Sequence, residues 1–224
     1  MTDIRRVWIT RAEPGAARTA ARLSALGFEP VVAPLLRLRP IAQPAPDLAG
    51  IAALAFTSRN GVAAFAALSE ARDRPVFTVG DATAEAAREA GFANVQSAGG
   101  ALDDLARLLA AEAPGPVLAP GALEPAGDLP ALLAGRVEVR LLPVYAAVET
   151  GTAAPAAFDA VLVHSPRAGR ALAALGPFAG PVCAAISQAA AAPLADRFGL
   201  EIRVASHPDE AALLQALGKP APRV

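Results

Sequence analysis

The sequence contains little of what covalent, disulfide or metal chemistry requires. Cys183 is the only cysteine, so neither an internal disulfide nor a cluster of thiolate ligands can form. We interpret Cys183 as a small core residue. The two histidines, His164 and His207, are distant in the chain and cannot make an ordinary zinc site alone. These shortages argue against a covalent or metal-dependent mechanism.

Long apolar runs are also missing. Proline, glycine or charge interrupts each run well before the roughly 20 residues that a membrane span needs. The chain starts with Met1 and a short polar segment, and a strand-like segment follows without an apolar signal-peptide region. We therefore expect a cytoplasmic protein without a membrane partner.

The charge balance excludes a general attraction to nucleic acid, because the formal net charge is −1 at pH 7. Lys219 is the only lysine, and arginine carries the remaining side-chain positive charge. Arginine suits carboxylate recognition, but a genome rich in Ala, Arg, Gly and Pro codons explains the bias equally well. The G-x-S-x-G, P-loop and H-E-x-x-H signatures are absent, and residues 79–83 lack the spaced glycines of a dinucleotide site.

A repeated strand-turn-helix unit organises the chain. Residues 54–61 (LAFTSRNG) and 161–168 (VLVHSPRA) each run from an apolar strand through serine into an alanine-rich helix. Serine favours the N-cap, and Pro166 suits a first helical turn. Each copy therefore predicts free backbone N–H groups at a strand end, which is a potential anion site.

Short apolar runs alternate with helical segments, which predicts an α/β fold with parallel sheets. The expected strands cover residues 6–10, 29–33, 53–57, 76–79, the vicinity of 95, 117–119, 137–142, 160–164, 182–186 and 202–205. The expected helices cover 16–26 and 209–217 and begin near 60, 81, 102 and 127, with others after the strands at 160 and 182.

The repeat also predicts a split domain. Glu13-Pro14 corresponds to Glu124-Pro125, so the last βαβ unit of the middle copy resembles the start of the chain. We therefore expect a discontinuous domain formed by residues 1–35 plus 150–224, and an inserted domain at 41–141. Segments 36–40 and 142–149 would pair as linker strands, with a hinge and an interdomain cleft.

Candidate binding groups follow from these turns. Helix starts lie after Arg11, Ser58, Gly80, Ser165 and Ser187, and each also has a purely structural interpretation as a cap or turn. Arg59 and Arg167 follow two of the serines and suit carboxylates, or they are solvated. Tyr145, the only tyrosine, either packs at the domain junction or belongs to the site. His164 fits a core or half-buried position better than a catalytic base.

At this level of detail the chain resembles the uroporphyrinogen-III synthase family, over essentially its whole length. The motifs that carry the resemblance are Ile9-Thr10-Arg11 with the helix ending at Gly27, Phe56-Thr57-Ser58, Val79-Gly80-Asp81-Ala82-Thr83-Ala84 with Gly91, Pro143-Val144-Tyr145, His164-Ser165-Pro166, and Ala185-Ile186 with a helix ending at Gly199. The resemblance implies two flavodoxin-like, doubly wound α/β domains joined by a two-stranded linker. It also implies a cofactor-free monomer.

The resemblance further implies a hydro-lyase of tetrapyrrole biosynthesis that cyclises hydroxymethylbilane, a linear tetrapyrrole, to uroporphyrinogen III with inversion of ring D. Tyr145 would be the catalytic residue. The resemblance implies that Ser58, Thr83, Ser165 and nearby backbone N–H groups hold the carboxylates of the substrate. Together with the helix starts and arginines described above, the expected substrate-binding residues are Arg11, Ser58, Arg59, Asn60, Gly80, Thr83, Ser165, Arg167 and Ser187. Two alternatives remain, a two-lobed protein that binds a small anion and a regulatory protein of the same fold without turnover.

Overall fold

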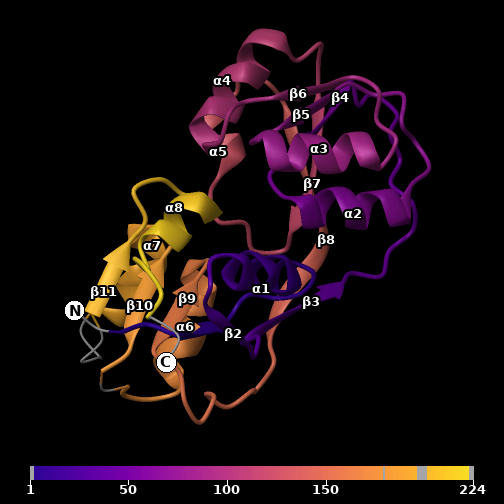
Figure 1. Ribbon diagram of the computed structural model, residues 1–224. Helices are drawn as coiled ribbons and strands as arrows, with labels where there is room; N and C mark the ends of the chain where they lie inside the picture. Colours follow the sequence, from indigo (N-terminus) through magenta and orange to yellow (C-terminus); the bar gives the residue numbers. More distant parts are fainter. Residues whose placement is uncertain (1–2, 179, 196–200, 222–224) are drawn as a thin grey trace. The chain divides into compact units, whose positions relative to one another are not determined.

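The computed structural model describes residues 3–178, 180–195 and 201–221. The chain divides into two compact units, which we describe separately. Unit 1 comprises Met1–Leu38 and Val148–Val224, and unit 2 comprises Arg39–Ala147. The expected helix end at Gly199 lies outside the described residues. Helices and strands alternate along both units, which confirms the α/β class (Figure 1).

Unit 1 contains a five-stranded parallel sheet in the order β11-β10-β9-β1-β2. Its strands are β1 (Arg6–Ile9), β2 (Glu29–Val32), β9 (Ala160–Val163), β10 (Val182–Ala185) and β11 (Glu201–Val204). Its helices are α1 (Gly15–Ala25), α6 (Pro166–Ala174), α7 (Gln188–Ala191), the 3-10 helix η1 (Ala192–Leu194) and α8 (Glu210–Gln215). This strand order is that of a flavodoxin-like sheet.

Both faces of this sheet are covered by helices, because its strands are apolar on both sides. Along β9, Val161 and Val163 pack with residues of α6, α7 and η1, whereas Ala160 and Leu162 pack with residues of α1 and α8. This division follows from the two-residue period of a strand. All four residues of β9 are buried, as expected for a central parallel strand.

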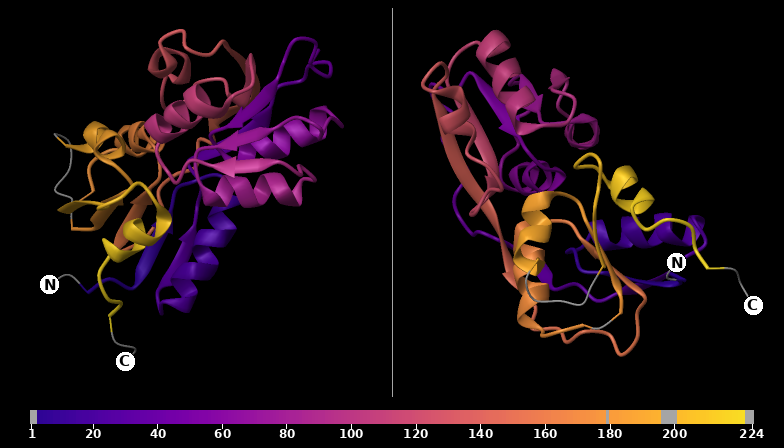
Figure 2. Two further views of the ribbon diagram at one scale, coloured as in Figure 1. Left: turned by 90° about the horizontal axis from the view of Figure 1, so that it is seen from above. Right: turned by 90° about the vertical axis from the view of Figure 1, so that its left-hand side faces the viewer.

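Unit 2 contains a six-stranded sheet in the order β3-β8-β7-β4-β5-β6. Its strands are β3 (Leu36–Pro40), β4 (Ala53–Phe56), β5 (Val76–Thr78), β6 (Val95–Ser97), β7 (Val117–Ala122) and β8 (Val139–Glu149). Its helices are α2 (Arg59–Leu68), α3 (Asp81–Glu89), α4 (Leu102–Glu112) and α5 (Leu129–Leu133). Helices α2 and α3 lie beside each other in unit 2, and the two further views of the ribbon are given in Figure 2.

The two sheets share one strand order once the chain is read in permuted form. In unit 1, β2-β1-β9-β10-β11 places the first βαβ unit beside the three later strands. In unit 2, β8-β7-β4-β5-β6 repeats that order, but the equivalent βαβ unit comes last in the sequence. This relation is the one that the Glu13-Pro14 and Glu124-Pro125 correspondence predicts, and it accounts for the discontinuous unit.

Strand β8 is longer than the sequence pattern predicts. The expected strand at 137–142 and the expected linker at 142–149 form one continuous strand, which is a hydrogen-bonded neighbour of β3. Pro143 does not break it, because Pro143 lies opposite Gly121, where the register with β7 shifts. Irregular ladder positions of this kind tolerate the missing N–H of proline. The unit boundaries at residues 38 and 148 fall within β3 and β8.

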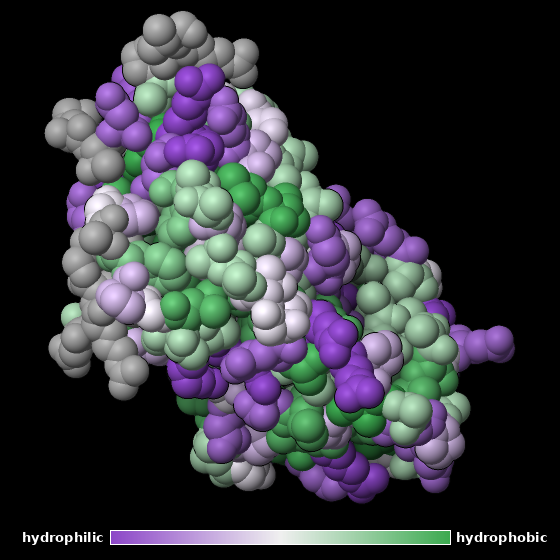
Figure 3. Space-filling model, turned by 90° about the horizontal axis from the view of Figure 1, so that it is seen from below, coloured by the Kyte–Doolittle hydropathy of each residue, from purple (hydrophilic) through white to green (hydrophobic). Residues whose placement is uncertain are grey.

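The exposed surface mixes residue types. Hydrophobic and hydrophilic residues are interspersed over the face drawn in Figure 3. Single exposed apolar side chains are normal for folded proteins. Among the described residues, no helix has the length and apolarity that crossing a membrane requires.

Candidate functional site

Three of the predicted site residues are serines that cap helices at the carboxyl ends of strands. The Oγ of Ser58 accepts a hydrogen bond from Gly61 N at 3.0 Å, Ser165 from Ala168 N at 3.2 Å, and Ser187 from Ala190 N at 3.3 Å. At each helix start the serine already accepts one N–H group of the first turn, and Pro166 at the start of α6 has no N–H, so the first turns of α2 and α7 keep more donors than that of α6. N–H groups at a helix start can donate hydrogen bonds to an anion.

The structure brings Ser58 and Tyr145 together. Ser58 Oγ lies 3.1 Å from Tyr145 Oη, and either hydroxyl can be the donor. The two residues are 87 positions apart, but β4 and β8 both neighbour β7, and Tyr145 lies opposite Ala122 at the carboxyl end of β7. Sequence reasoning selected both residues without predicting this contact. The hydrogen bond connects the N-terminus of α2 to the phenol.

Close backbone packing holds α2 in this position. A Cβ on Gly61 would approach Pro120 O to 2.7 Å, which is closer than real Cβ contacts come. Glycine therefore lets the first turn of α2 lie directly against the end of β7, the strand that pairs with β8. The separation between the Ser58 cap and Tyr145 depends on this approach.

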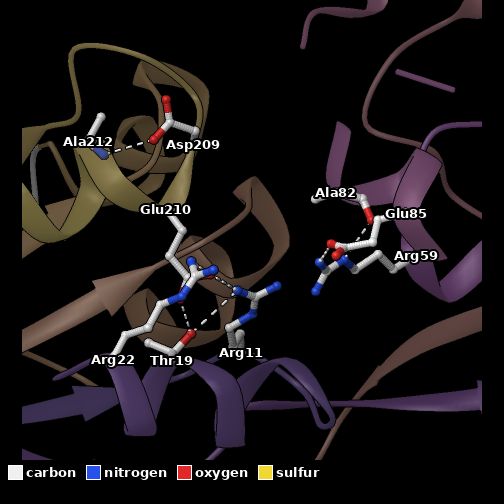
Figure 4. A network of polar contacts seen from close by, with 9 residues as sticks. All are labelled: Arg11, Thr19, Arg22, Arg59, Ala82, Glu85, Asp209, Glu210 and Ala212. Atoms are coloured by element: carbon white, nitrogen blue, oxygen red, sulfur yellow. Dashed lines mark hydrogen bonds and ion pairs between the residues drawn. The ribbon is translucent and has the colours of Figure 1, made fainter. Parts of the chain in front are cut away.

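Helix α3 provides a second group of predicted site residues in unit 2. Gly80 is its N-cap and makes no side-chain cap bond, and Thr83 lies on its buried face with 6% exposure. Arg59 of α2 donates from Nε to Ala82 O at 2.9 Å and pairs with Glu85 at 3.5 Å (Figure 4). Arg59 therefore ties α2 to α3, and Asn60 lies half-buried beside it in the first turn.

Negative charge distinguishes α3 from α2. Asp81 occupies the first turn of α3 and accepts a hydrogen bond from Ser97 Oγ at 2.7 Å, and Glu85 follows one turn later. The first turn of α2 contains no acidic residue. Because the carboxylate of Asp81 already lies in the first turn of α3, an anion should be repelled less at the N-terminus of α2.

In unit 1, Arg11 lies in a network at the carboxyl end of β1 (Figure 4). Its Nη1 donates to Glu210 Oε2 at 3.1 Å, and Arg22 Nη1 lies 3.3 Å from the same oxygen. Thr19, which is fully buried, donates its hydroxyl to the other oxygen of Glu210. The guanidinium of Arg11 rests against Gly15, where a Cβ would come within 2.5 Å of Arg11 Nε.

Burial lowers the pKa of Arg11, and the charge of Glu210 opposes this effect. Arginine nevertheless remains protonated in proteins. Arg11 was expected from the sequence, whereas Glu210 and Thr19 were not. Glu210 is 199 residues away from Arg11 in the chain, and no short-range pattern connects the two.

The remaining predicted residues of unit 1 lie at the start of α6 and α7. Arg167 lies in the first turn of α6, after Ser165. A Cβ on Gly169 would collide with Ala190 O, so α6 and α7 touch through their backbones. Helix α7, which follows Ser187, has only four residues.

His164 precedes Ser165 at the end of β9. Both ring nitrogens are buried, and neither has a hydrogen-bond partner among the described residues. Burial, and secondarily the charge of Arg11, lowers the pKa of His164 to about 3. The imidazole is therefore neutral at pH 7, which agrees with the expected structural position and not with a general acid.

Cys183 has the core position that the sequence predicts. It is fully buried in β10, and burial raises the pKa of its thiol to about 12. A neutral buried thiol is a poor nucleophile. Within the described residues, no group of three or more His, Cys, Asp or Glu side chains could hold a metal ion.

We expect Glu210→Gln to lower the free energy of unfolding by about 1–3 kcal/mol, because two arginines and a buried hydroxyl lose their shared carboxylate. Urea denaturation followed by the fluorescence of Trp8, the only tryptophan and a buried residue of unit 1, measures this loss. The matched control is Glu201→Gln. Glu201 is more exposed and pairs with Arg203, so the control should lower the free energy of unfolding much less than Glu210→Gln does. Equal losses would contradict the structural role of Glu210.

His164 should make unit 1 less stable in acid. Its pKa is about 3 when folded and near 6.5 in the unfolded chain, so between these values only the unfolded chain binds the proton. The stability present above pH 6.5 is therefore lost as the pH falls toward 3. In His164→Phe, we expect the loss of unfolding free energy between pH 7 and pH 5 to be about 1–2 kcal/mol smaller than in wild type.

Urea denaturation followed by Trp8 fluorescence, carried out at pH 7 and at pH 5, tests this expectation. The control is His207→Gln, because His207 is exposed and contacts Ser206. It should retain the pH dependence of wild type. If His164→Phe retains it as well, the buried imidazole is not the titrating group.

Both the sequence and the fold of this chain are similar to those of known proteins. The sequence profile of the family described as uroporphyrinogen-III synthase HemD matches residues 17–215. Uroporphyrinogen-III synthetase from Helicobacter pylori 26695 is 17% identical, with a TM-score of 0.64 over 96% of this chain and 98% of that one. A mutant uroporphyrinogen III synthase from the extremely thermophilic bacterium Thermus thermophilus is 18% identical, with a TM-score of 0.55 over 96% of this chain and 90% of that one.

No curated protein sequence matches the chain significantly. At these identities, the solved structures show the shared fold, and the family profile shows the relationship because it covers most of the chain. The chain therefore belongs to the uroporphyrinogen-III synthase HemD family.

Proposed function

We propose that this protein is a uroporphyrinogen-III synthase. It would convert hydroxymethylbilane to uroporphyrinogen III with loss of water and inversion of ring D, in the biosynthesis of tetrapyrroles such as haem, sirohaem, cobalamin and chlorophyll. Family membership supports the reaction class. The observation that carries the proposal for this chain is the hydrogen bond between Ser58 and Tyr145 at the N-terminus of α2.

The proposed reaction does not require a nucleophilic side chain from the protein. Departure of the terminal hydroxyl as water leaves an electrophilic azafulvene, and the substituted carbon of ring D attacks it to form a spiro intermediate. Recombination then closes the macrocycle with ring D inverted. Every reacting carbon belongs to the substrate, so the protein has to fold the chain and assist the leaving group. This requirement agrees with the neutral thiol of Cys183 and the neutral imidazole of His164.

Tyr145 is the proposed group at the leaving hydroxyl. If Ser58 donates its hydroxyl proton to Tyr145 Oη, then the phenol can donate its own proton to the departing oxygen. The negative charge that develops on the phenol oxygen is then stabilised by Ser58. Ser58 can do this while it accepts the Gly61 N–H, because a hydroxyl both donates and accepts.

The carboxylates of the substrate would bind to helix starts and arginines. In unit 2, the best site is the first turn of α2, because it carries no acid. Arg59, Gly80 and Thr83 would have weaker roles, because Arg59 is paired with Glu85 and Thr83 is nearly buried.

In unit 1 the proposed groups are Arg11, Ser165, Arg167 and Ser187. We expect a cytoplasmic monomer that needs no cofactor.

The direct test supplies hydroxymethylbilane and separates the uroporphyrinogen isomers. The expected product is the type III isomer. Product that consists only of the type I isomer, which forms spontaneously, would reject the proposal. Saturable binding of uroporphyrinogen III without turnover would instead indicate a regulatory protein of this fold, and binding of inorganic phosphate alone would indicate a protein for small anions.

We expect Tyr145→Phe to lower kcat about 10- to 100-fold, which is the effect of one well-placed donor. The steady-state rate of type III isomer formation at saturating substrate measures it. Ser58→Ala should lower kcat as well and reduce the further effect of Tyr145→Phe, because the two hydroxyls act together.

Ser58→Ala also removes the N-cap of α2, so a second variant has to measure the effect of losing a helix cap alone. Asp128 caps α5 in the same unit through Ala131 N at 3.0 Å and has no proposed role in the site. Asp128→Ala and Ser58→Ala should each cost about 1 kcal/mol of stability, and only Ser58→Ala should change kcat. An unchanged kcat in Tyr145→Phe would reduce Tyr145 to a packing residue.

A further inference from the structure

An apolar groove of about 650 Å³ lies on unit 1 between α1 and α8, and includes residues from the end of the described chain. Its wall includes the C-terminal part of α1 with Arg22 and Leu26, the start of β2 near Phe28, and the segment that follows α8. Its volume is within the range of small-molecule sites in proteins. The groove contains none of the residues proposed to bind the tetrapyrrole.

The groove combines an apolar floor with an apolar edge. Phe28 is 4% exposed and Leu214 is 6% exposed, so both side chains are anchored in the core of unit 1. Leu26, at the end of α1, is 51% exposed and extends this apolar surface toward solvent. Burying such a surface under the hydrocarbon part of a ligand is favourable.

Specific contacts hold in place the wall of the groove that the segment after α8 forms. Arg203 donates from Nη1 to Ala216 O and Leu217 O, which holds the end of α8. Pro220 forms a parallel bridge with Ile4, and Ala221 N donates to Ile4 O at 2.9 Å. These contacts preform the groove, so a ligand would not have to order this segment.

The charges at the groove have one sign. Arg22 and Lys219 line it, and the described lining residues include no aspartate or glutamate. Glu210 pairs with Nη1 of Arg22 from outside the lining, and the guanidinium carries further N–H donors besides those on Nη1. Lys219 is the only lysine of the chain. A ligand with a negative head and an apolar body complements this arrangement.

We infer that the groove binds a small amphipathic carboxylate, with its hydrocarbon chain on Leu26, Phe28, Leu214 and Pro220 and its carboxylate at Lys219 and Arg22. The inference does not depend on the proposed enzymatic activity. A neutral ligand of the same length would lose the interaction with the two cations. A second copy of this chain is the competing occupant of such a surface.

Isothermal titration of the full-length protein with decanoate and with decanol tests the inference. We expect saturable one-to-one binding of decanoate, several-fold tighter than that of decanol. Lys219→Gln should reduce this preference, because it removes one of the two charges. Absence of saturable binding, or equal affinity for the acid and the alcohol, would overturn the inference.

A matched pair of leucine variants locates the site. Leu26 and Leu175 are both exposed C-cap leucines followed by a glycine, but only Leu26 lines the groove. Leu26→Gln should weaken both ligands about 10-fold, and Leu175→Gln should change neither. Equal effects of the two variants would mean that decanoate binds elsewhere. Sedimentation that shows a dimer disrupted by Leu26→Gln, without decanoate binding, would assign the groove to a second copy.

Discussion

Both units depend on one constraint, the burial of both faces of a parallel sheet. The central strands are apolar on both sides, as the alternating contacts of Ala160–Val163 show, so each needs helices above and below. Helical crossovers between parallel strands then bring strand ends and helix starts to the same edge of the sheet. The capping serines Ser58, Ser165 and Ser187 all lie at such ends. The donors for an anion therefore arise from the same connections that build the core.

Charge gives these otherwise similar helix starts different properties. Asp81 places a negative charge in the first turn of α3, and Glu85, one turn later, pairs with Arg59 at the start of α2. The first turn of α2 has no acidic residue of its own and contacts a phenol through Ser58. In unit 1, Arg11 is held by Glu210, so its position is fixed before any ligand binds. Helix geometry alone would make these helix starts equivalent as anion sites. The neighbouring side chains make them different.

Much of the fold could be predicted because it depends on local signals. The alternation of apolar runs with capped helices located the strands and helices of both units, and the repeat around Ser58 and Ser165 indicated the duplication. The similarity of Glu13-Pro14 to Glu124-Pro125 indicated the permuted order, which the two sheets display. The length of β8 was missed, since Pro143 marks a strand end unless the register of the neighbouring strand shifts beside it.

The sequence by itself determined the α/β class, the permuted duplication and the serines at the helix starts, because each of these depends on residues that are close in the chain. Only the tertiary structure decided that Tyr145 meets Ser58, that Glu210 joins Arg11 to Arg22, and that His164 lies without a partner among the described residues. These contacts join segments that are distant in the chain, and strand order and helix packing set them. A side chain's partners and pKa depend on that packing, which local sequence patterns do not encode.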